Sequence, residues 1–148
     1  YRAYEVLNGT YRRVSALPEA VLQAFITCDV EIVKILNLIA ILMDSRLFFE
    51  FLREVYNEKI RLGEKEITDR DLNVFFADKA MQSDVVAGWT DTAVRKLKQC
   101  FTRMMFEAGL LESSVKPRTI KQVHIDYRTE ELLTANGLGK YLKAVKGV

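Results

Sequence analysis

The chain has 148 residues, 49% of them hydrophobic, which is enough to bury a sizeable core without a metal or a disulfide and predicts one domain. Its formal net charge is only +2, yet residues 1–92 carry 11 Lys and Arg against 15 Asp and Glu, whereas residues 93–148 carry 11 against 5. The positive excess in the last third indicates a polyanionic partner. Because the chain begins at Tyr1 rather than Met, we expect that an N-terminal segment precedes it.

Apolar residues recur at spacings of three and four over most of the chain, which predicts a mainly α-helical fold. The expected helix ends carry residues that cap helices, because their side chains or backbone conformations satisfy the first or last turn. The predicted helices cover residues 4–17, 18–27 (opened by Pro18), 30–43 (capped by Asp29), 45–62 (capped by Asp44 or Ser45, ended by Gly63), 68–82 (capped by Thr68) and 90–108 (capped by Thr90 and Asp91, ended by Gly109).

The most apolar of these segments, residues 30–43, is shorter than the ~20 residues of a membrane span and contains Glu31 and Lys34, so it is expected to be a buried core helix. Two cysteines, Cys28 and Cys100, lie far apart among apolar residues and have no CxxC partner. They are interpreted as buried thiols in a reducing compartment, with a disulfide or a reactive thiol as the alternative. Both features favour a cytoplasmic protein without membrane contact.

Beyond Gly109 the hydrophobic period changes. Residues 110–115 and 119–126, in which Val123 and Ile125 alternate with polar residues, predict a small C-terminal β-hairpin around a turn at 116–119. A helix restarts at Thr129, and a short basic helix follows over residues 138–146. The expected fold is therefore a compact multi-helix domain over residues 1–148, in which residues 89–148 form a basic, winged-helix-like part.

Few residues could carry catalysis or hold a metal. The one histidine, His124, falls in the predicted hairpin and is interpreted as a surface strand residue. No P-loop, GxGxxG, HExxH or zinc-ligand spacing occurs. The carboxylate pairs Glu64/Glu66 and Asp69/Asp71 could bind a divalent ion, but a polar loop and the first turn of a helix explain them more simply. We expect no enzyme activity, no cofactor and no metal site.

The helix over residues 90–108 separates into two arcs when its residues are placed at about 100° per step. One arc is apolar, and after the capping Asp91 the opposite arc contains no acidic residue before Glu107. Such a face suits phosphates, because each phosphate neutralised by a cation releases condensed counterions. The apolar arc contains Val94, Leu97, Phe101, Met104, Met105 and Ala108, and the polar arc contains Arg95, Lys96, Lys98, Gln99, Thr102 and Arg103.

Other cations could extend this strip. The predicted hairpin contributes three, and the last helix contributes Lys140, Lys143 and Lys146. The alternative is a solvated surface that only keeps the domain soluble, but such a face usually mixes both signs, as the helix over 45–62 does. The candidate phosphate contacts are Arg95, Lys96, Lys98, Arg103, Lys116, Arg118 and Lys121, with Arg12 and Arg13 as weaker candidates.

Several packing and capping motifs form a recognisable set. They read YRRVSAL at residues 11–17, SRLFFEFL at 45–52, ITDRDL at 67–72, WT at 89–90 and FEAGLL at 106–111. This set resembles the BrxA family of bacterial BREX phage-defence systems. The resemblance implies a small helical cytoplasmic protein that works beside other BREX components and binds double-stranded DNA without strong sequence preference. It implies no active site.

Two functions are therefore weighed. The first is a non-catalytic, double-stranded-DNA-binding accessory protein of a BREX-type phage-defence system, which contacts phosphates and not bases. The alternative is a protein-interaction subunit whose basic surface docks an acidic partner in the defence complex. A nuclease or another enzyme has little support among the residues.

Overall fold

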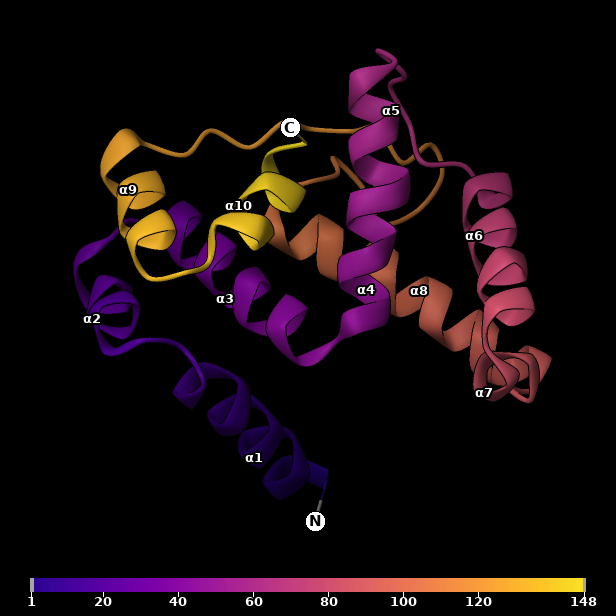
Figure 1. Cartoon of the computed structure of the whole chain (residues 1–148), viewed down its shortest axis with the longest axis horizontal. Helices are drawn as coiled ribbons and strands as arrows, with labels where there is room; N and C mark the ends of the chain where they lie inside the picture. Colours follow the sequence, from indigo (N-terminus) through magenta and orange to yellow (C-terminus); the bar gives the residue numbers. More distant parts are fainter. Residues whose placement is uncertain (1, 148) are drawn as a thin grey trace.

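The computed structural model describes residues 2–147 and confirms a mainly helical chain (Figure 1). The helices agree with the sequence prediction to within a few residues at most ends. They are α1 (Arg2–Ser15), α2 (Glu19–Thr27), α3 (Val30–Asp44), α4 (Arg46–Phe51), a π-helical segment (Leu52–Tyr56), α5 (Asn57–Arg61), α6 (Asp69–Gln82), α7 (Asp84–Ala87), α8 (Asp91–Ala108), α9 (Tyr127–Ala135) and α10 (Gly139–Lys146).

Helix α3 lies at the centre of the packing, as its apolar sequence predicts. It contacts α1, α2, α4, α8 and α10, and seven of its residues are buried. Ile39 and Leu36 are fully enclosed. A helix packed on several sides does not need a single apolar stripe, which explains why α3 is apolar nearly all round. No helix in the described range 2–147 is long and apolar enough to cross a membrane.

Helices α4 and α5 form one continuous rod through the π-helical segment, and α8 crosses behind this rod in Figure 1. The π turn widens the helix: the N–H of Asn57 donates to the carbonyl oxygen of Leu52, five residues earlier. Phe48, Phe51 and Tyr56 are all fully buried along the rod. The continuous helix was predicted, but the π turn was not, because one wide turn leaves the apolar spacing almost unchanged.

Most of the predicted caps are confirmed. Thr68 and Asp71 form a reciprocal capping box at the start of α6, and Thr90 accepts a hydrogen bond from the N–H of Ala93 at the start of α8. Gly109 ends α8 with φ of 88°, a left-handed conformation that glycine adopts without strain. Asp29 stands at the N-cap position of α3, but its side chain makes no capping hydrogen bond.

The predicted β-hairpin does not form. Within residues 2–147 the segment after α8 contains no strand, only isolated antiparallel bridges that join Thr119 to Glu66 and Ile120 to Leu111. Beyond them the chain runs extended towards α9, and Ile125 is buried against the helical core. The alternation around Ile125 therefore reflects an extended segment that packs on helices, since no second strand pairs with it.

The prediction for the cysteines is also wrong in part. Both thiols are free, as expected, and Cys28 is half-buried, but Cys100 is exposed. Phe101 marks the buried side of α8, and one residue at about 100° turns Cys100 away from it, to the border of the apolar arc beside the half-buried Leu97 and Met104.

Candidate functional site

Helix α8 is fixed by its apolar face. Phe101 and Met105 are buried, and the ring of Phe101 lies 4.8 Å from the ring of Phe48 between centroids. Thr102, which the sequence placed on the polar arc, is buried as well, and its hydroxyl donates to the carbonyl oxygens of Lys98 and Gln99. The two sides of α8 that carry cations therefore have a fixed orientation relative to the rest of the fold.

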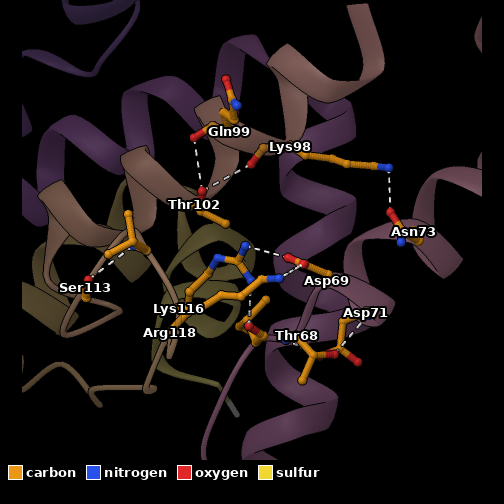
Figure 2. Close-up of polar contacts among 12 residues, drawn as sticks. Thr68, Asp69, Asp71, Asn73, Lys98, Gln99, Thr102, Ser113, Lys116 and Arg118 are labelled. Carbon is orange, nitrogen blue, oxygen red and sulfur yellow. Dashed lines mark hydrogen bonds and ion pairs between the residues drawn. The ribbon is translucent and has the colours of Figure 1, made fainter. Parts of the chain in front are cut away.

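One side of α8 lines an open cleft of about 740 Å³, which lies between α8, the first half of α6 and the loop at 113–118. Four of the nine predicted phosphate-contacting residues line this cleft, and Figure 2 shows polar contacts along it. Two carboxylates, Asp69 and Asp91, line it as well, so cations outnumber acidic groups two to one. The four cations are Arg95, Lys98, Lys116 and Arg118.

At the inner end of the cleft, one carboxylate holds two cations. Asp69, the first residue of α6, accepts a hydrogen bond of 2.6 Å from Nη2 of Arg118 and forms an ion pair with Lys116 (Figure 2). Arg118 also donates from Nη1 to the carbonyl oxygen of Ile67 at 3.1 Å. Lys116, and then Arg118, hold the pKa of Asp69 below its ordinary value. This cluster attaches the loop to the start of α6.

The outer part of the cleft carries the other two cations. Nζ of Lys98 donates to Oδ1 of Asn73 at 2.6 Å and lies 5.8 Å from the centroid of the Phe76 ring, so the ammonium group is held at the wall. Arg95 is exposed and makes no ion pair within the described part of the chain. Its guanidinium is free to meet a ligand.

The remaining predicted cations lie elsewhere, so the nine do not form one surface. Lys96 and Arg103 lie on the outer side of α8, where Nε of Arg103 is 3.2 Å from Oε1 of Glu107. Lys121 lines a separate hollow near the end of α8. In α1, Arg12 is 3.0 Å from Asp44, and Arg13 is half-buried. The last helix adds Lys146, which pairs with Glu130 of α9.

Sequence reasoning missed the part that Asp69 and Asn73 take in the cleft. Asp69 was interpreted as a helix-start residue, which it is, but its contact with residues 116 and 118 joins positions nearly fifty apart. The sequence gives no sign of that contact. Asp91 was recognised only as a cap, although a charge in the first turn of α8 necessarily lies near Arg95, four residues later.

Three of the four carboxylates considered for a divalent ion contact cations of the chain instead. Glu64 pairs with Lys59, which also lies 2.9 Å from Asp71. Burial raises the pKa of Asp71, but hydrogen bonds from Thr68 and Lys59 outweigh it and leave that pKa lowered. These carboxylates therefore stabilise the start of α6. His124 lines another hollow, beside α2 and α9, and within residues 2–147 no group of three His, Cys, Asp or Glu side chains could hold a metal.

Comparison with known proteins places the chain in a family. The BrxA family model matches residues 1–137. A BREX protein BrxA from Bacillus cereus (strain H3081.97) is 36% identical over 146 residues, which are 99% of this chain and 73% of that protein. A crystal structure of an uncharacterized protein from Magnetospirillum magneticum has the same fold, with a TM-score of 0.80 over 92% of this chain and 71% of that one, at 18% identity. The chain therefore belongs to the BrxA family.

Proposed function

We propose that this chain is a non-catalytic, cytoplasmic accessory protein of a BREX-type phage-defence system, which binds double-stranded DNA through its phosphates and without sequence preference. The observation that carries the proposal is the cleft beside α8, where Arg95, Lys98, Lys116 and Arg118 meet from two segments of the chain. The defence role follows from family membership, since the Bacillus cereus relative is named a BREX protein. Other BREX components are the expected protein partners.

The physical argument is electrostatic. Duplex DNA carries about one charge per 1.7 Å of its axis, so several cations in one cleft can neutralise successive phosphates and release counterions. Contacts of this type position a protein on the duplex without reading bases. The loop at 113–118 carries Lys116 into the cleft, and we propose that it takes the place of the predicted wing in the basic part at 89–148.

A salt series tests the proposal. Fluorescence anisotropy with unrelated labelled duplexes should give the same affinity for each. The logarithm of affinity should fall with that of salt, with a slope near −1.8 if Arg95 and Lys98 alone contact phosphates and up to −3.6 if all four cations do. Between 0.05 M and 0.2 M salt, these slopes correspond to a loss of about 12-fold to about 150-fold. Equal affinities with no salt dependence would contradict phosphate binding.

Helix α8 offers a matched pair of variants. The double substitution Arg95→Glu/Lys98→Glu reverses two charges in the cleft, and Lys96→Glu/Arg103→Glu reverses two charges on the outer side. Both change the net charge of the protein equally. If DNA lies in the cleft, the first variant should reduce the slope by about 1.8, and the second should reduce it less. The opposite order would move the DNA to the outer side.

One observation favours the alternative function, a subunit that docks an acidic protein. The cations of the loop already bind a carboxylate, that of Asp69, which is the group an acidic partner would offer. This alternative expects no DNA binding even at 0.05 M salt. It also expects that Arg95→Glu/Lys98→Glu abolishes co-purification with another BREX component.

A further inference from the structure

The inner end of the cleft already holds an anion. Oδ1 of Asp69 lies 2.6 Å from Nη2 of Arg118, and Oδ2 of the same carboxylate is paired with Nζ of Lys116 (Figure 2). Two cations of one loop thus share the two oxygens of one carboxylate. A phosphodiester also presents two oxygens that share a negative charge, and Arg and Lys bind both groups by charge-assisted hydrogen bonds.

The two cations differ in their freedom to change partner. The side chain of Arg118 is only 11% exposed and is also bound to the carbonyl oxygen of Ile67. The side chain of Lys116 is 67% exposed, and Asp69 is its one ion-pair partner in the described part of the chain. Asp69 itself is 46% exposed, so a ligand can reach the pair. Arg118 is therefore a fixed part of the fold, whereas Lys116 can exchange its anion.

We infer that Asp69 occupies a phosphate subsite of the cleft in the free protein, and that a phosphate of the DNA backbone replaces it on Lys116 when DNA binds. This inference rests on the proposed DNA binding. Asp69 then acts as an internal counter-ion. It neutralises Lys116 before DNA arrives and repels the incoming phosphate, so it lowers the affinity for every duplex alike.

The test removes the charge of Asp69 and keeps its shape. Asp69→Asn retains an oxygen that can accept a hydrogen bond from Arg118 but carries no negative charge. Asp91→Asn is the matched control, because Asp91 lines the same cleft, is also the first residue of its helix, and makes no ion pair within residues 2–147. Lys116→Gln is made in the wild-type and Asp69→Asn backgrounds. Affinity for one mixed-sequence duplex is measured by anisotropy over a range of salt concentrations.

The expected gain is that of one more released counterion. Asp69→Asn should bind up to about eight-fold more tightly at 0.1 M salt, with a slope steeper by about 0.9. Asp91→Asn removes an equal charge from the cleft without releasing a paired cation, so it should increase the affinity and steepen the slope less than Asp69→Asn does. Lys116→Gln should cost less than two-fold in the wild-type background, yet cancel the whole gain in the Asp69→Asn background. Such non-additivity identifies direct coupling between residues 69 and 116.

Three results would overturn the inference. The first is that Asp69→Asn binds the duplex no more tightly than Asp91→Asn. The second is that Lys116→Gln lowers the affinity by the same factor in both backgrounds. Either result leaves the proposed DNA binding intact. If Asp69→Asn proves too unstable to compare, Lys116→Gln must still cost less than Arg95→Gln, since Arg95 makes no ion pair in the described chain. In contrast, if the wild-type protein and all variants leave the duplex unbound at 0.05 M salt, the proposed function itself fails, and this inference fails with it.

Discussion

Truncation of Phe101 to alanine should remove the centre of the aromatic cluster that holds α8 in place. The ring of Phe101 is 2% exposed and lies 4.8 Å from Phe48, 5.5 Å from Phe51 and 5.6 Å from Phe76, between ring centroids. These rings come from α4, α6 and α8, so few side chains can move into the space that the truncation leaves. We expect the free energy of unfolding to fall by about 4 kcal/mol, within the range for buried Phe→Ala changes.

Urea denaturation, followed by far-UV circular dichroism, measures this loss. With an m-value of about 2 kcal/mol/M, the midpoint should fall by about 2 M while m stays unchanged. Phe106→Ala is the matched control, because it is the same substitution on the same helix at a ring that is 44% exposed. It should cost about 1 kcal/mol, since much less apolar area leaves water at that position.

The reasoning is refuted if Phe101→Ala costs less than about 2 kcal/mol with an unchanged m-value, or no more than Phe106→Ala. Either result would mean that the cluster closes around the cavity and that other contacts fix α8. If Phe101→Ala does not fold at all, Phe101→Leu keeps most of the volume and should cost about 1 kcal/mol.

Three further predictions concern stability, all measured by urea midpoints. Lys79→Ala should lower the free energy of unfolding by about 2 kcal/mol, because the ammonium of Lys79 lies 3.0 Å from Glu50 and 3.0 Å from Glu54. This loss is below the range for fully buried ion pairs, since Glu54 is 40% exposed. Gly147→Ala should be destabilising, since its Cβ would collide with Cδ1 of Ile60 at a φ of +78°. Ile60→Val in the same chain should remove that collision, but neither the 3.2 Å contacts with Cβ and Cγ2 of residue 60 nor the backbone strain. The pKa values of Asp69 and Asp71 are lowered in the folded protein, so these two carboxylates stabilise the fold above pH about 4, and this stabilisation is lost as the pH falls through their folded-state pKa values. The urea midpoint should therefore fall in acid. It should fall less in the double variant Asp69→Asn/Asp71→Asn.

The sequence predicts those parts of the fold that depend on neighbouring residues. The helix periods, the capping box of Thr68 with Asp71 and the stop at Gly109 all rest on spacings of up to four residues, and they are confirmed. The burial of α3 follows from its composition. The hairpin prediction failed because alternation at Ile125 is shared by any extended segment with one buried side, whether that side faces a strand or a helix.

The cleft could be predicted only in part. At about 100° per residue, Arg95 and Lys98 lie about 60° apart and Lys96 and Arg103 about 20° apart, with the two pairs on different flanks of one polar arc. A polar arc whose charges share one sign therefore need not form a single binding surface. Which flank of the arc lines the cleft depends on the neighbouring segments that pack against α8. The contact of Asp69 with the loop at 113–118 joins two such segments, and no local sequence pattern relates them.

The contacts of the cleft also determine which of its cations can report on DNA binding. The side chain of Arg118 is only 11% exposed and holds both Asp69 and the carbonyl oxygen of Ile67, so its replacement would loosen the loop whether or not DNA touches it. A loss of affinity in such a variant would say little about a phosphate contact. Arg95 has no ion pair in the described chain, and Lys116 has one exposed partner. A change in salt slope on substitution of Arg95 or Lys116 can therefore be attributed to the ligand, because these two side chains contribute least to the stability of the fold.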